Sequence, residues 1–167
     1  DIALEPDLIN ASFSGNANIN LKVNKKTNKI NFHAKDLDLK NIELELENKK
    51  ITPKNVTFKK DLEQVVLTFN ELINPGTIKL SLSFSGKLND QLRGFYRSTY
   101  AKENGEKEFL ATTQFEATDA RRAFPCWDEP NFKATFKIKL IVSSEYEALS
   151  NMALEKKVKL QNGKISF

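Results

Sequence analysis

The chain has 167 residues, of which 40% are apolar and 29% charged, and its 26 basic and 22 acidic residues give a formal net charge of +4. A chain of this length can bury roughly two-thirds of the surface that it exposes when unfolded, so it can form one well-packed domain. No basic cluster interleaved with aromatic residues occurs, which disfavours nucleic-acid binding. No apolar run approaches the roughly 18 residues of a membrane-spanning helix. We therefore expect one domain, residues 1–167, without a nucleic-acid partner or a membrane span.

Alternation of apolar and polar residues with a period of two runs through most of the chain and indicates β-strands with one buried face. In chain order the predicted strands are 12–23, 29–34, 41–46, 55–58, 65–69, 77–84 and 132–140. Turn-forming residues separate them at 25–28, 48–50, 74–76, 85–86, 104–105 and 162–163. The one helical feature expected is a turn near residues 119–123. Short strands at this spacing predict an all-β fold, an antiparallel β-sandwich with little helix.

The last four residues, Lys164 to Phe167, open another apolar strand for which the sequence offers no partner. A natural domain rarely leaves such a strand unpaired. We therefore expect the domain to be cut short at its C-terminal end.

One cysteine, Cys126, and one histidine, His33, limit the metal and thiol chemistry of the chain. A single cysteine excludes an internal disulfide, and a single histidine excludes a zinc site built from two imidazoles. A nucleophilic Cys126 would need a base, and His33 lies far away in sequence, in a different strand pattern. We therefore expect neither a catalytic residue nor a metal ligand here, and we interpret His33 as a strand-face residue.

The segment that follows residue 112 carries the most specific chemistry. Gln114 and Glu116 should lie on one side of a strand, with Phe115 on the other side facing the core. A carboxylate beside a carboxamide suits an ammonium group, because the acid supplies negative charge and the amide can donate or accept. On composition alone, Glu116 could equally be a surface carboxylate and Gln114 an amide that binds backbone or water.

Charged residues follow closely, with Arg121 and Arg122 among the acidic residues Asp119, Asp128 and Glu129. Such a group could form an acid–base constellation or a phosphate site. We favour a structural interpretation, in which these charges satisfy one another and nearby backbone groups.

These residues also carry a resemblance to a known family. The motif Gln114-x-Glu116, followed by Asp119-Ala120-Arg121-Arg122-x-Phe124-Pro125-Cys126-x-Asp128-Glu129-Pro130, resembles the N-terminal domain of zinc aminopeptidases typified by aminopeptidase N and the puromycin-sensitive aminopeptidase. Nearly the whole chain is similar to that domain: residues 1–6 to its first strand, 94–98 to its hairpin after a stretch matched by residues 86–90, and 148–152 to the end of a later strand. The resemblance implies a saddle-shaped β domain that precedes a thermolysin-like catalytic domain and closes one side of its active site.

In that family the acid of the Gln-x-Glu motif contacts the free α-amine of the substrate, together with a glutamate of a Gly-x-Met-Glu-Asn loop in the next domain. The resemblance therefore implies that Glu116 binds the substrate N-terminus and that Gln114 lines the pocket for the first side chain. Neither that loop nor a His-Glu-x-x-His motif occurs in this sequence. Zinc would then be bound by a catalytic domain outside this chain, which alone would hydrolyse nothing. The implied partners are a peptide N-terminus and that catalytic domain.

Two other interpretations stay open. Non-catalytic scaffold relatives, including one in a general transcription factor, keep the sandwich and have lost the zinc site, although an intact Gln114-x-Glu116 favours the enzyme. A free-standing adhesion or sugar-binding sandwich would explain the fold and leave the motif unexplained. The resemblance to the puromycin-sensitive branch implies broad specificity, and the sequence leans toward a cytoplasmic location.

Overall fold

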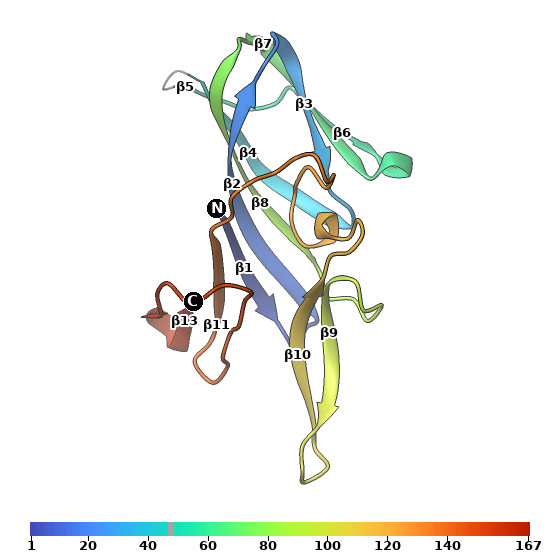
Figure 1. Cartoon of the computed structure of the whole chain (residues 1–167), viewed down its shortest axis with the longest axis vertical. Coiled ribbons are helices and arrows are strands. Elements are labelled where there is room, and N and C mark those ends of the chain that lie inside the picture. Colours follow the sequence, from blue (N-terminus) through green and yellow to red (C-terminus); the bar gives the residue numbers. More distant parts are fainter. Residues whose placement is uncertain (47–48) are drawn as a thin grey trace.

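The computed structural model describes residues 1–46 and 49–167, which form an all-β fold with three short 3₁₀ turns (Figure 1). The strands are β1 (Ile2–Asp7), β2 (Ser12–Val23), β3 (Thr27–His33), β4 (Leu37–Leu46), β5 (Lys49–Ile51), β6 (Asn55–Lys59), β7 (Gln64–Ile73), β8 (Gly76–Lys87), β9 (Gly94–Ala101), β10 (Lys107–Gln114), β11 (Ile138–Ser143), β12 (Val158–Lys159) and β13 (Lys164–Ser166). The 3₁₀ turns are η1 (Lys60–Leu62), η2 (Ala120–Arg122) and η3 (Gln161–Gly163). The second of these is the helical turn expected near residue 119.

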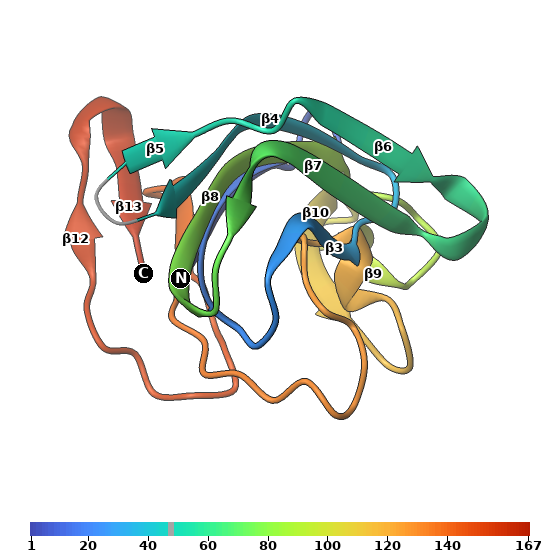
Figure 2. The same cartoon turned by 90° about the horizontal axis from the view of Figure 1, so that it is seen from above.

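The largest sheet has eight strands in the order β12-β13-β11-β1-β2-β8-β4-β5, and it curves strongly when seen from above (Figure 2). At its centre β2 and β8 pair antiparallel along their full lengths, from Ser12 opposite Lys87 to Val23 opposite Gly76. One pairing departs from the predicted antiparallel pattern, because β11 runs parallel to β1. Before β11 the chain passes through β9, β10 and η2, which lie outside the large sheet. A hairpin therefore does not connect β1 with β11, as expected for a parallel pair.

Two glycines on the apolar face of this sheet make room for two phenylalanine rings. Gly15 lies opposite Phe84 and Gly86 lies opposite Phe13 in the β2–β8 register. A Cβ on Gly15 would lie 2.5 Å from Cζ of Phe84, and one on Gly86 would lie 2.7 Å from Cζ of Phe13. The predicted turn at residues 85–86 is therefore wrong, because Gly86 is a strand residue whose missing side chain is filled by a neighbouring ring.

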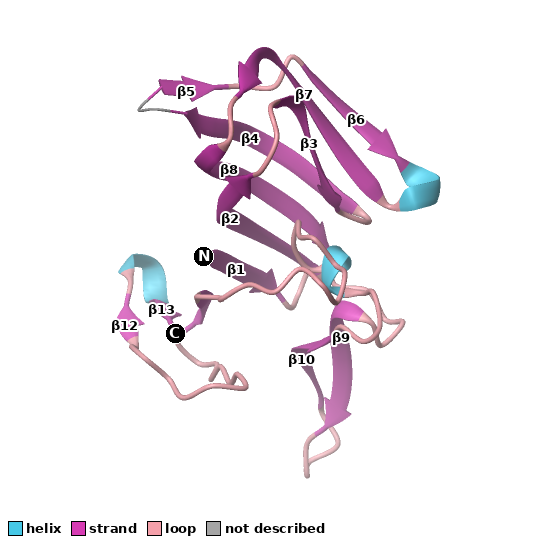
Figure 3. Ribbon diagram, turned by 45° about the horizontal axis from the view of Figure 1, so that its top comes forward, coloured by secondary structure: helices cyan, strands magenta, loops and turns pink. Residues whose placement is uncertain are grey.

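A three-stranded sheet of order β3-β7-β6 lies against the part of the larger sheet that contains β4 and β8 (Figure 3). Its inward residues Phe32, Leu67 and Phe69 belong to the same buried cluster as Leu44 and Leu80 of the large sheet. Burial of large aliphatic and aromatic side chains at about 1.5–3 kcal/mol each is the main stabilising term of such a sandwich. The alternation seen in sequence thus corresponds to a core between two layers, as predicted.

The remaining strands, β9 and β10, form a two-stranded hairpin that projects from the sandwich (Figure 1). Arg97 of β9 links it to the body, since its Nη1 donates to the carbonyl of Leu8 at 2.6 Å. Within the hairpin, its guanidinium lies 4.1 Å from the centre of the Phe109 ring of β10. Gly94 and Gln114 face each other at the base of the hairpin. The base, where β10 ends, is the part of the fold that positions the candidate site.

Three further predictions near the C-terminus are wrong. Of the strand predicted at 132–140, only the part from Ile138 onward is strand, and Phe132 and Phe136 lie exposed in an irregular segment. Residues 148–152 form no strand. The terminal strand is not unpaired, because β13 pairs with both β11 and β12. Predicted turns at 104–105 and 162–163 do fall between strands, and of the turn predicted at 74–76 the last residue, Gly76, already begins β8. Asn48 of the turn predicted at 48–50 lies outside the described residues.

Candidate functional site

The two predicted site residues lie where β10 ends. Gln114 is the last residue of β10 and is exposed, and Glu116 is exposed two residues later, after the strand has ended. Between them Phe115 turns inward, packing against the core with its ring 5.7 Å from that of Phe124 at 88°. Both polar side chains are therefore open to solvent, on a backbone that the intervening aromatic ring fastens to the interior.

The backbone beyond Glu116 turns back at once into η2. The amide of Asp119 donates to the carbonyl of Phe115 at 3.0 Å, and the amide of Arg122 donates to the carbonyl of Asp119 at 3.1 Å. The peptide bond between Glu116 and Ala117 is cis. Residues 115–122 are thus a compact turn rather than a continuation of the strand, which sequence alternation alone could not reveal.

Arg122 connects this turn to two other parts of the fold. Its Nε donates to Oδ1 of Asp119 at 2.8 Å, and its Nη1 donates to Oδ2 of Asp36 at 2.6 Å. Its aliphatic stem lies against Gly94, where an added Cβ would be 2.6 Å from Cβ of Arg122. Gly94 also has a φ of +69°, a conformation that favours glycine. One arginine therefore joins the β3–β4 connection, the turn and the base of the hairpin.

Arg121, the neighbouring residue of η2, forms a second cluster with different partners. Its Nε donates to Oδ2 of Asp128 and its Nη1 donates to Oε2 of Glu63, each at 3.0 Å. Glu63 also pairs with Lys35, and the hydrogen bond from Lys35, with further help from Arg121, lowers the pKa of Glu63 below its ordinary value. The structural interpretation of the charged residues therefore holds for both arginines. Sequence reasoning missed Asp36 and Glu63, because they lie far away in the chain and in no motif.

His33 and Cys126 prove to be neighbours, so the sequence argument that kept them apart is wrong. The amide of His33 donates to the carbonyl of Cys126 at 2.7 Å, and the amide of Cys126 donates back at 3.1 Å. Burial raises the pKa of the Cys126 thiol to about 12, so the thiol stays protonated and unreactive at neutral pH. The Nδ1 atom of His33 accepts a hydrogen bond from the amide of Asp128 at 3.3 Å. Both residues join β3 to the loop after η2.

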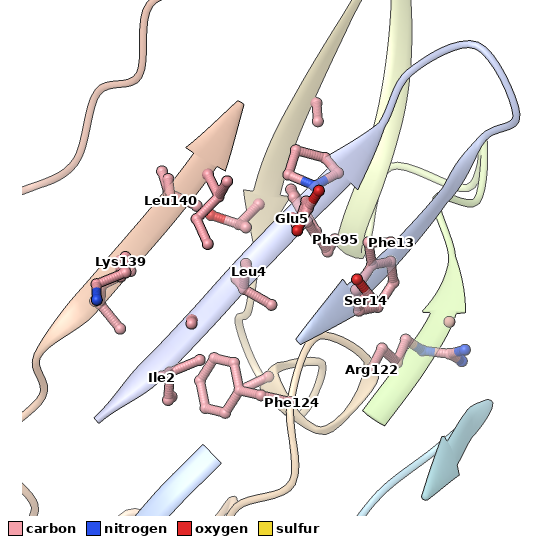
Figure 4. Close-up of a pocket in the computed structure, with 18 of the residues that line it drawn as sticks. Ile2, Leu4, Glu5, Phe13, Ser14, Phe95, Arg122, Phe124, Lys139 and Leu140 are labelled. Atoms are coloured by element: carbon pink, nitrogen blue, oxygen red, sulfur yellow. The ribbon is translucent and has the colours of Figure 1, made fainter. Parts of the chain in front are cut away.

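A broad open hollow of about 3920 Å³ lies beside the turn, between the sheet and the C-terminal segment. Ile2, Leu4 and Phe124 line it, as Figure 4 shows. Phe115 belongs to the same lining. Its volume far exceeds the roughly 300–1,000 Å³ of small-molecule pockets. Neither Gln114 nor Glu116 belongs to its lining. The two candidate residues are therefore exposed to solvent and lie outside this hollow.

Within residues 1–46 and 49–167, no group of three or more His, Cys, Asp or Glu side chains is arranged to hold a metal ion. With one histidine in the sequence, this chain cannot supply a zinc site built from two imidazoles. Over the same described residues, no helix is both long and apolar enough to cross a bilayer.

Comparison with known proteins identifies the class. The model of the Peptidase M1 N-terminal domain matches residues 1–167, and the chain belongs to this family. It is 47% identical over 164 residues to Aminopeptidase M1 of Arabidopsis thaliana, a match that covers 95% of this chain and 18% of that protein. It is 38% identical over 166 residues to the Puromycin-sensitive aminopeptidase of Caenorhabditis elegans, covering 98% of this chain and 17% of that protein.

The Alanine/arginine aminopeptidase of Saccharomyces cerevisiae is 42% identical over 158 residues, covering 91% of this chain and 18% of that protein. The chain thus spans less than a fifth of the length of the curated relatives that it matches. These relatives are named as aminopeptidases, and the matched region is the N-terminal domain of M1 peptidases.

Proposed function

We propose that this chain is the substrate-recognition domain of a zinc metallo-aminopeptidase, in which Glu116 binds the α-ammonium group of a peptide and Gln114 lines the pocket for its first side chain. Zinc and the residues that activate its water belong to a catalytic domain elsewhere in the whole protein, and the chain by itself has no hydrolytic activity. The proposed location of the enzyme is the cytoplasm. The enzyme would release single residues from peptide N-termini.

The observation that carries this proposal is the exposed Gln114-x-Glu116 pair on a turn fixed from both sides. A carboxylate held in place outside the domain's own core can bind a ligand presented by a neighbouring domain. An ammonium group placed between Glu116 and a second carboxylate of the catalytic domain would relieve their mutual repulsion. An internal peptide nitrogen carries no charge and would leave the two acids repelling each other, so the arrangement selects free N-termini.

The test is the substitution of Glu116 in the full-length protein. Glu116→Gln keeps the shape of the side chain and removes its charge, so kcat/KM on an unblocked aminoacyl substrate should fall at least about tenfold, the effect of one lost charge-assisted hydrogen bond. Zinc content, measured by elemental analysis, should not change. Glu103→Gln, at an exposed position in the β9–β10 turn, is the matched control and should leave kcat/KM as it is. A Glu116→Gln enzyme with near-normal kcat/KM would remove the assignment.

Gln114→Ala provides a second, smaller readout. If Gln114 lines the pocket for the first side chain, this substitution should change the ranking of aminoacyl substrates more than it changes the mean rate. An unchanged ranking would assign Gln114 to backbone or solvent contacts alone.

A further inference from the structure

We propose that Arg122 is a positioning residue for recognition of the substrate amine, an inference that rests on the proposed function of Glu116. Arg122 does not touch the substrate in this scheme. It fixes the turn that carries Glu116 with respect to both the hairpin and the sandwich, and so determines where the Glu116 carboxylate stands.

The contacts of Arg122 reach both sides of Glu116 in the chain. On the C-terminal side, its Nε holds Asp119, three residues beyond Glu116, at 2.8 Å. On the N-terminal side, its stem packs on Gly94, whose strand partner is Gln114. The Arg122 side chain therefore contacts the backbone region on either side of Glu116. Arg122 is itself largely buried, with 13% of its side-chain area exposed.

The third contact of Arg122, with Asp36, connects the turn to the sandwich. Asp36 lies in the connection between β3 and β4, with a left-handed φ of 56°, and accepts from Nη1 of Arg122 at 2.6 Å. A planar guanidinium can direct Nε to one carboxylate and Nη1 to another in a fixed relation. A lysine ammonium at the same position keeps the charge and cannot hold both carboxylates in that geometry. The substitution Arg122→Lys therefore separates positioning from charge.

Loss of this fixation should matter because catalytic geometry is sensitive to small displacements. A misplacement of about 1 Å can cost up to about a hundredfold in rate even when the altered residue lies away from the chemistry. Phe115 still holds the turn through Phe124, so we expect Arg122→Lys to loosen the turn without unfolding the domain.

The experiment is a double-mutant cycle in the full-length protein, with hydrogen exchange measured alongside. Arg122→Lys should lower kcat/KM on an unblocked aminoacyl substrate about tenfold in the wild-type background and less than about twofold in the Glu116→Gln background. Deuterium uptake over residues 114–119 should rise, while uptake over β2 and β8 stays the same. Arg93→Lys is the matched control, because it is the same substitution at an exposed side chain. It should leave kcat/KM and the uptake of residues 114–119 unchanged.

Two results would overturn the inference. Equal losses of kcat/KM in both backgrounds would mean that Arg122 acts independently of Glu116, and unchanged uptake over residues 114–119 would mean that it does not fix the turn. Failure of the proposed function is distinguishable from both, because Glu116→Gln alone would then leave kcat/KM near normal, whatever hydrogen exchange shows for Arg122. Asp36→Asn removes one of the two carboxylates, and its exposed side chain makes unfolding unexpected. Asp36→Asn should also lower kcat/KM more in the wild-type background than in the Glu116→Gln background, but by a smaller factor than Arg122→Lys.

Discussion

The sandwich and the turn after β10 are held together by different forces. In the sandwich, rings and aliphatic side chains from two sheets fill one buried cluster, with glycines opposite phenylalanines. In the turn and the loop that follows it, two arginines, four carboxylates and reciprocal backbone bonds between His33 and Cys126 do most of the fastening. Close packing fixes the sandwich through shape, whereas a guanidinium that binds two carboxylates fixes their relative geometry through directed hydrogen bonds. The difference suits the role that we propose for Glu116, whose carboxylate would have to be held in one position.

The largest expected loss of stability follows from replacing Arg121, which holds the ion-pair cluster beside the turn. Replacing it with Met leaves Asp128 and Glu63 without their shared partner at sites that are mostly shielded from water, with 13% and 25% of their side-chain areas exposed. The free energy of unfolding should fall by about 2–3 kcal/mol. Urea unfolding of the domain, followed by the fluorescence of its single tryptophan, Trp127, measures this. A loss below about 0.5 kcal/mol, the level of an ordinary surface substitution, would show that the cluster does not hold the turn.

On the packing side, the corresponding test is Gly86→Ala. The added methyl group would lie 2.7 Å from Cζ of Phe13 and 2.9 Å from Cδ2 of Leu37, so the free energy of unfolding should fall by about 1–2 kcal/mol. All of these neighbours are side-chain atoms, so shortening the ring with Phe13→Leu should recover part of the loss. At Gly15 the added Cβ also meets the backbone oxygen of Ala3 at 2.6 Å, and no ring substitution can relieve that contact. Equal rescue at both glycines would contradict this account of the packing.

The smallest expected effect is a pH dependence at His33. Burial, with help from Arg121, lowers the pKa of His33 below 6.5, against the opposing charges of Glu129, Asp128 and Glu63. The unfolded chain therefore binds the proton more readily than the folded chain. The stabilisation is complete above pH 6.5 and is lost as the pH falls through the folded pKa. The melting temperature of the wild type should drop over this window, whereas His33→Gln should flatten the slope.

Glu63 does not interfere with this measurement. The pKa of Glu63 in the folded chain is lowered from its ordinary value of 4.5, so its effect on stability changes only at a pH below that of the His33 window. There the sign is that of an acid, with stability lost only as the pH falls through the folded pKa. Parallel slopes for wild type and His33→Gln between pH 5 and 7 would mean that His33 does not titrate with unfolding.

The same contrast explains what could be predicted from sequence. Strands such as β2 and β8 can be predicted from the alternation of apolar and polar residues, because one face of each strand is buried. The inward direction of Phe115 was also predictable. The turn that carries Glu116 and the partners Asp36 and Glu63 were not, because ion pairs between distant segments leave no period in the sequence. The prediction of a turn at Gly86 is wrong because the neighbouring sequence does not distinguish a glycine in a turn from a strand glycine whose missing side chain makes room for the Phe13 ring. Phe132 and Phe136 were misread as strand because their alternation continues where the structure offers no partner strand.

The most direct measurement of the central claim is a crystal structure of the full-length protein with a bound aminoacyl inhibitor that has a free α-amine. The account predicts that the ammonium nitrogen lies within hydrogen-bonding distance, about 2.7–2.9 Å, of a Glu116 carboxylate oxygen. It also predicts that Arg122 still spans Asp119 and Asp36 in that complex. An inhibitor whose amine contacts no atom of Glu116 would contradict the account.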